Sequence, residues 1–109
     1  MALHVTIEDN RYMERFFRDF SQYADEIKEN IYHTLPELIA YRPDKIKAAY
    51  HLKRDDHTIL EYKVVVSHAN FRAAYTRVGD DVNVFFISKT TIKRFFVSQL
   101  ESTSLVDNH

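Results

Sequence analysis

The sequence contains no cysteine, only one glycine and only two prolines. Without cysteine, the chain can form neither a disulfide framework nor a thiolate zinc site. A single glycine excludes the glycine-rich loops that hold nucleotide cofactors, because those loops need several positions without a Cβ. The six histidines show no HxH or HxxxH spacing, which would place two imidazoles on one face. We therefore expect no cofactor and no metal site.

Long apolar runs are missing as well. The sequence has no stretch of 18 uninterrupted apolar residues, and residues 1–8 lack both a basic leader and a continuous apolar segment, so we expect a cytoplasmic protein that does not contact a membrane. Its 109 residues have room for a single core. Because 45% of the residues are hydrophobic, with seven Tyr and eight Phe, we expect one independently folding domain over residues 1–109.

Charge is distributed unevenly along the chain. The net charge is -1, but residues 1–41 hold 4 basic and 8 acidic side chains, whereas residues 42–94 hold 11 basic and 6 acidic ones. A local basic patch, rather than the total charge, sets the field that a phosphate group experiences. The middle of the chain therefore points to an anionic partner, with an ordinary scatter of solvated lysines and arginines as the alternative.

The first third of the chain has the pattern of one strand and two helices. Residues 3–7 alternate between apolar and polar, which is typical of a half-buried strand. Residues 13–20 place Met and Phe on one face of a helix, and a second amphipathic helix starts near Ser21. Pro36 is expected to break or kink this second helix, and residues 41–44 to form a turn.

After residue 45 the period changes to that of strands. Gly79 is expected to provide a positive φ angle for a tight hairpin, and a last helix is expected to close over one face of the sheet. The expected strands span residues 46–53, 60–66, 71–78 and 82–89, the last helix spans residues 92–100, and residues 102–109 are expected to fray. The predicted fold class is α+β: an N-terminal strand, a two-helix hairpin, an antiparallel meander of three to four strands and a C-terminal helix.

A polar patch is expected on one face of this meander. Leu60 and its apolar neighbours occupy one face of their strand, which leaves Glu61 and Lys63 together on the other, solvated face. Placing Arg72 on the next strand adds a second cation to this face. The alternative interpretation is a cross-strand ion pair with a stabilising contribution of ~0 to 1 kcal/mol.

Residues 52–94 resemble the RelE/ParE superfamily of bacterial toxins. Leu52-Lys53 followed by Ile59-Leu60-Glu61-Tyr62-Lys63 resembles the HigB-type pattern, and Phe71-Arg72-Ala73-Ala74-Tyr75 resembles a strand of RelE. Val84-Phe85-Phe86-Ile87-Ser88 is similar to the strand that follows, and Phe86 to Thr90 is similar to a segment of HigB-like proteins. The resemblance implies a RelE-like domain and an mRNA interferase, a toxin that cleaves messenger RNA on the ribosome without a metal ion and is neutralised by an antitoxin protein.

The resemblance also implies roles for individual residues. Attack of a ribose 2'-hydroxyl on the adjacent phosphate needs a base and cations that stabilise the developing charge. Glu61 is the expected base, and the expected stabilising cations are Lys63, Arg72 and Lys89. The further RNA-binding candidates are Lys53, Arg54, Tyr75, Lys93 and Arg94.

The sequence departs from the family pattern at three places. Thr91-Ile92 stands where RelE has a basic residue, Val84 where HigB-like enzymes often have a histidine, and Ser98 where RelE has a tyrosine of its final helix. No general acid can be assigned. Two alternatives therefore accompany the interferase: a ParE-like toxin that binds DNA gyrase, and a diverged, non-catalytic module that binds a protein partner.

Overall fold

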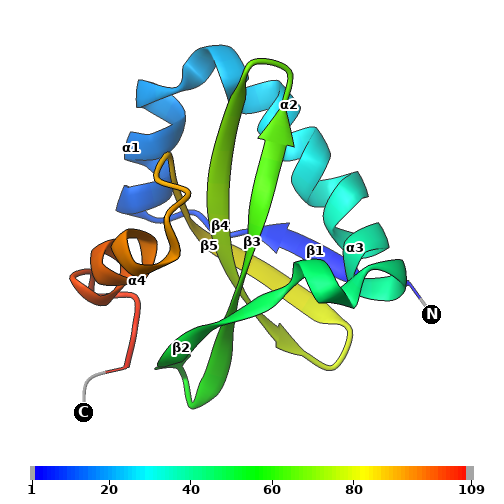
Figure 1. Cartoon of the computed structure of the whole chain (residues 1–109), viewed down its shortest axis with the longest axis vertical. Coiled ribbons are helices and arrows are strands. Elements are labelled where there is room, and N and C mark those ends of the chain that lie inside the picture. Colours follow the sequence, from blue (N-terminus) through cyan, green and yellow to red (C-terminus); the bar gives the residue numbers. More distant parts are fainter. Residues whose placement is uncertain (1, 108–109) are drawn as a thin grey trace.

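A mixed five-stranded sheet forms the centre of the protein. The computed structural model describes residues 2–107, and its strands follow the order β1-β5-β4-β3-β2. The strands are β1 (His4–Ile7), β2 (Lys47–Arg54), β3 (His57–Val66), β4 (Ala69–Val78) and β5 (Asp81–Ser88). The last four strands are antiparallel neighbours, as the sequence predicts, whereas β1 pairs in parallel with β5. In Figure 1, β3 and β4 run steeply while β1 and β5 lie obliquely behind them, so the sheet is strongly twisted.

Helices cover both faces of this sheet. Between β1 and β2 the chain forms α1 (Arg11–Asp19), α2 (Ala24–Glu29), a π-helical segment (Asn30–Thr34) and α3 (Leu35–Tyr41), and after β5 it forms α4 (Lys93–Glu101). The side chain of Asn10 begins α1 by accepting hydrogen bonds from the backbone N–H groups of Tyr12 and Met13, the ordinary N-cap arrangement. The fold class is therefore α+β.

The helical segment from Ala24 to Tyr41 is irregular next to Pro36, where the sequence predicts a break or a kink. The residues at both of its internal junctions have helical backbone angles, and the N–H of Leu35 donates to the carbonyl of Asn30, five residues earlier. A proline ring clashes with the carbonyl four residues before it, here that of Tyr32. The wide π turn places its irregularity just before the proline, and the helix continues to Tyr41 instead of breaking.

The two faces of the sheet carry separate cores. The face under α1, α2 and α3 is rich in aromatic residues, and its buried members include Phe16, Ile27, Ile31, Tyr62, Val64, Phe71, Tyr75 and Val84. The opposite face packs against α4 and the residues after it, with Ala49, Leu52, Ile59, Phe85, Phe86, Phe96, Leu100 and Leu105 buried. Both faces are thus covered.

The segment after α4 also differs from the expected frayed tail. Leu105 is buried in the α4-side core. The carboxylate of Asp107 accepts hydrogen bonds from the backbone N–H groups of Asp55 and Asp56 at 2.8 and 2.9 Å, in the β2–β3 turn where both residues have positive φ angles. Residues 102–107 are therefore packed onto the domain, and residues 108–109 lie outside the described part of the chain.

The hairpin at Gly79 follows the expectation. Val78 pairs with Asp81, so Gly79 is the first of the two connecting residues, and its φ angle is +61°. Only a residue without a Cβ adopts this region freely. The turn aligns β4 with β5 from Val78 and Asp81 to Tyr75 and Val84, beyond which a bulge shifts the register so that Ala74 pairs with Phe86.

Candidate functional site

The register of the meander places three cations on the α4 side of the sheet, and α4 adds a fourth. Lys63 on β3 lies directly opposite Arg72 on β4, and Lys47 on β2 lies directly opposite Glu61 on β3. Partners in antiparallel strands share a face, as do alternate residues of one strand. The side chains of these two pairs therefore all project from the same side of the sheet. Lys93 of α4 joins them, with its Nζ 3.9 Å from Glu61 Oε1. We call Lys47, Lys63, Arg72 and Lys93 the cationic patch.

Glu61 lies beneath this patch and is not solvated. Its side chain is completely buried, and its Oε1 accepts a hydrogen bond from Arg72 Nη1 at 2.7 Å. The other carboxylate oxygen, Oε2, has no hydrogen-bond partner. Burial raises the pKa of Glu61 above its ordinary value, against the opposing effect of Arg72 and Lys93. The expected solvent position was wrong because α4 covers the face that the strand pattern leaves polar.

Arg72 is held in place by its own hydrogen bonds. Besides Glu61, it donates from Nε and Nη2 to the backbone carbonyl of Thr91, at 3.2 and 2.7 Å. These contacts tie β4 to the connection between β5 and α4, and the side chain keeps 17% of its surface exposed. A guanidinium has five N–H groups, so two of them are not used in these bonds. Arg72 is a preorganised cation at the edge of the patch.

A wide bulge in β2 places an aromatic ring beside the patch. Residues 49–52 lie between Ala48, which pairs with Leu60, and Lys53, which pairs with Thr58, so four β2 residues oppose Ile59 alone. Tyr50 has a left-handed φ angle of +50° and keeps 53% of its surface exposed. Lys93 Nζ lies 4.8 Å from the centre of its ring. Bulges of this kind redirect side chains, often near functional sites.

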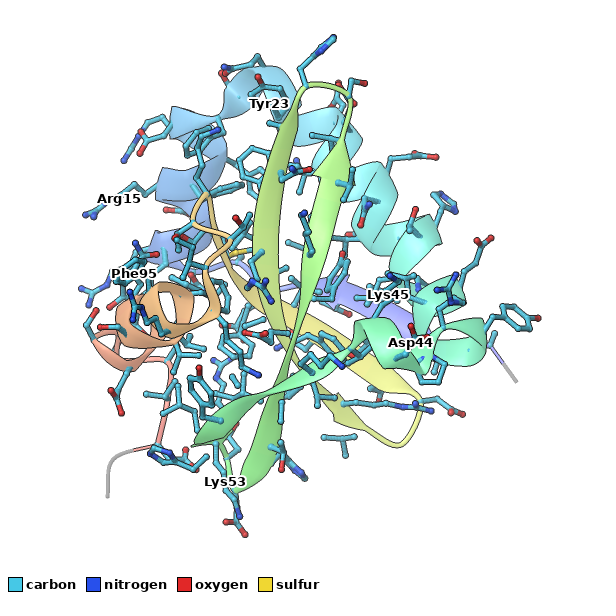
Figure 2. All side chains as sticks on the ribbon, viewed as in Figure 1. Arg15, Tyr23, Asp44, Lys45, Lys53 and Phe95 are labelled. Carbon is cyan, nitrogen blue, oxygen red and sulfur yellow. The ribbon has the colours of Figure 1, made fainter. Side chains whose placement is uncertain are left out.

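Three expected candidates lie away from the patch. Lys89 lies on the side covered by α1, α2 and α3, against the rings of Phe20 and Phe71, and it lines a hollow of about 380 Å³ beside α1. Arg54 forms a bidentate ion pair with Glu8, at 2.9 Å for both contacts. Figure 2 places Lys53 at the tip of the β2–β3 hairpin. The structure therefore does not bring Lys89, Lys53 or Arg54 together with Lys63 and Arg72.

Two RNA-binding candidates remain, Tyr75 and Arg94. Tyr75 is 1% exposed in the core under α1, α2 and α3, and burial raises its pKa to about 12. It cannot stack on a nucleobase. Arg94 lies over the ring of Phe95 on α4, 4.9 Å from its centre.

Sequence reasoning missed Lys47 and Tyr50. Lys47 carries no motif, and its position opposite Glu61 depends on the strand register. Tyr50 sits in a bulge that no alternation of apolar and polar residues indicates. Of the expected site residues, Glu61, Lys63, Arg72 and Lys93 come together.

Across residues 2–107, no three acidic or histidine side chains gather in a way that could hold a metal ion. None of the helices in this part of the chain is long and apolar enough to cross a membrane.

Comparison with known proteins gives no match. No family model matches the chain, no curated protein is significantly similar in sequence, and no solved structure is significantly similar in fold.

Proposed function

We propose that the chain is a RelE/HigB-like toxin that binds single-stranded messenger RNA through the cationic patch and cleaves it on the ribosome. The observation that carries the proposal is the direct pairing of Lys63 with Arg72. Two like charges opposite each other in a sheet are mutually destabilising. An anion between them removes that repulsion, and a phosphodiester is an anion that a guanidinium and an ammonium bind well.

The order of elements supports the same proposal. A strand, a helical region, a four-stranded meander and a closing helix agree with the architecture that the resemblance of residues 52–94 implies. The patch also lies on the strands that carry the resembling motifs, since Lys63 and Arg72 belong to β3 and β4. The chain's antitoxin partner, in this proposal, is an acidic protein segment that competes with RNA for the patch.

In this proposal, the patch residues have different roles in cleavage. In the reaction, the 2'-hydroxyl loses its proton to solvent, the 2'-oxygen forms a bond to the adjacent phosphorus, and the bond from phosphorus to the 5'-oxygen breaks. The leaving 5'-oxygen takes a proton from solvent, which gives a 2',3'-cyclic phosphate and a 5'-hydroxyl. Lys63 and Arg72 stabilise the negative charge that develops on the phosphate oxygens. Glu61 is buried and paired, so it positions Arg72 instead of taking the proton of the 2'-hydroxyl. This replaces the base role that the resemblance implies for Glu61.

Glu61 also favours a second candidate function. With its carboxylate buried beneath the patch, the surface presents cations without an accompanying base. A non-catalytic module that binds an acidic protein partner needs only these cations. A ParE-like toxin that binds DNA gyrase is a separate alternative, and it likewise needs no catalytic base.

Induced expression in bacteria separates the two candidates. We expect growth arrest with transcripts cut within codons, and we expect Lys63→Ala combined with Lys47→Ala to abolish both. Neither lysine makes an intramolecular ion pair with an acidic side chain in residues 2–107, so the double variant should fold normally. Arg18→Ala removes an exposed cation from α1 and is the matched control.

The outcomes distinguish the candidates clearly. Arrest without RNA cleavage supports the ParE-like toxin, and absence of arrest supports the non-toxic partner-binding module. Cleavage that persists in the double variant contradicts the role of the patch. In binding experiments with single-stranded RNA, the log-log salt slope should lose about 0.7 in magnitude for each phosphate contact removed. A slope that is flat in the unmodified protein excludes RNA as the ligand.

A further inference from the structure

The exposed aromatic ring of Tyr50 lies at the border of the cationic patch, and Tyr50 is not among the expected site residues. Tyr50 keeps 53% of its surface exposed although it belongs to β2, whose neighbouring residues Ala49 and Leu52 are buried in the α4-side core. The bulge turns these two inward and leaves the tyrosine outside. The ring therefore contributes little to the core.

The backbone at Tyr50 is held in a costly conformation. Its φ angle is +50°, a region where L residues with a Cβ are destabilised by about 1–2 kcal/mol, and which Gly or Asn adopts more readily. Outliers of this kind persist where the surrounding structure enforces them, and they cluster at functional sites. Here both flanking anchors, Ala49 and Leu52, enforce the bulge.

Lys93 fixes the ring relative to the patch. Its Nζ donates a hydrogen bond to the carbonyl of Ala48 at 2.7 Å, lies 4.8 Å from the centre of the Tyr50 ring and lies 3.9 Å from Glu61 Oε1. One ammonium thus connects the aromatic ring, the β2 backbone and the buried carboxylate. An aromatic face beside several cations is the combination with which proteins bind single-stranded nucleic acids, because bases stack on the ring while phosphates lie along the cations.

We propose that Tyr50 is a stacking platform for an unpaired nucleobase of the RNA whose phosphates occupy the cationic patch. This inference rests on the proposed function and adds a base-recognition element to it. Stacking on a tyrosine tolerates any base, since each base has a π face. The platform therefore increases affinity for single strands without selecting a sequence, and it excludes a fully paired duplex, whose bases are already stacked.

The test compares two ligands of equal charge. Fluorescence anisotropy measures binding of a labelled single-stranded octaribonucleotide and of an abasic oligomer with the same ribose-phosphate backbone. We expect the unmodified protein to bind the base-bearing strand about 5- to 100-fold more tightly, as one stacked base contributes. Tyr50→Ala should reduce this ratio to near one while leaving the abasic affinity unchanged, and Tyr50→Phe should retain it.

Controls separate this inference from the proposed function. Tyr41 is 79% exposed on α3, so Tyr41→Ala removes an exposed tyrosine elsewhere and should leave the ratio unchanged. One outcome overturns the stacking platform but supports the cationic patch. In that outcome the unmodified protein binds both ligands with equal affinity, and the Lys47→Ala, Lys63→Ala double variant binds neither. Absence of binding to either ligand overturns both. Circular dichroism verifies that Tyr50→Ala is folded. If Tyr50→Ala unfolds, Tyr50→Asn is used in its place, because asparagine tolerates the left-handed backbone.

Discussion

The two faces of the sheet are packed with different kinds of side chains. On the side of α1, α2 and α3, the core is almost purely apolar, and Phe71 contacts the rings of Phe16, Phe20 and Tyr23 with centroids 5.4–5.6 Å apart. On the side of α4, the core surrounds a buried carboxylate, Glu61. An apolar core gains stability from burial, whereas burying a charge costs free energy unless it is well paired. The α4 side therefore combines apolar packing with a buried ion pair, and that pair holds Arg72 in place.

The partly buried carboxylate of Glu8 contrasts with the completely buried carboxylate of Glu61. Glu8 accepts hydrogen bonds from Arg54, Asn10 and Asn83, and although burial opposes them, these bonds lower its pKa below the ordinary value. Glu61 has Arg72 as its hydrogen-bond donor and one oxygen without a partner. Both oxygens of Glu8 accept hydrogen bonds, whereas one oxygen of Glu61 does not. The hydrogen bond that Glu61 accepts from Arg72 orients the guanidinium.

The largest effect is expected on the apolar side. Phe71→Ala removes the ring at the centre of the aromatic cluster and should lower the free energy of unfolding by about 3–5 kcal/mol, because the transfer free energy is lost and a cavity remains. Urea denaturation measures the change. Val65→Ala, at an exposed position of β3, is the control and should change it by less than about 0.5 kcal/mol. A small effect of Phe71→Ala would contradict the assignment of the main core to this side.

On the α4 side, breaking the ion pair should cost slightly less. Arg72→Met leaves Glu61 buried beside Lys93 alone and should lower the free energy of unfolding by about 3 kcal/mol. Replacing both partners, as in Glu61→Leu with Arg72→Met, should recover most of this loss, since apolar side chains of similar volume suit a buried site. Failure of the double variant to recover would mean that Glu61 contributes packing that leucine cannot reproduce.

A smaller effect is expected at the bulge beside the patch. Tyr50→Asn and Tyr50→Val both remove the ring, but asparagine tolerates a left-handed backbone and the β-branched valine does not. Tyr50→Asn should therefore be more stable than Tyr50→Val by about 1 kcal/mol in the same denaturation experiment. Equal stabilities would show that β2 relaxes to ordinary strand geometry without the tyrosine.

The finest test of the comparison uses pH. Because the pKa of Glu61 is raised above its ordinary 4.5, its contribution to stability is fully present below that value and is lost as the pH rises through the raised pKa. Glu8, with a lowered pKa, contributes stability above 4.5 that is lost as the pH falls. Subtracting the stability profile of Glu61→Gln from that of the unmodified protein should give a falling curve, and Glu8→Gln a rising one. Two curves of the same slope would contradict the contrast between the carboxylates.

Local patterns were sufficient for most of the helices and strands. The spacing of Met13 and Phe16 predicts α1, the alternation around Tyr62 predicts β3, and Gly79 predicts the last hairpin, because each depends on residues close together in the chain. Such periodicity also predicts which face of β3 is apolar. It contains no information about what covers the polar face.

The sequence by itself determined the α+β class, the order of the elements and the presence of cations in the middle of the chain. Only the tertiary structure decided that β1 pairs with β5, that α4 buries Glu61, and that the β2 bulge presents Tyr50 beside Lys93. The physical reason is that local periodicity reflects solvent exposure within one element, whereas register and packing depend on contacts between residues far apart in sequence. The cationic patch is a product of those contacts.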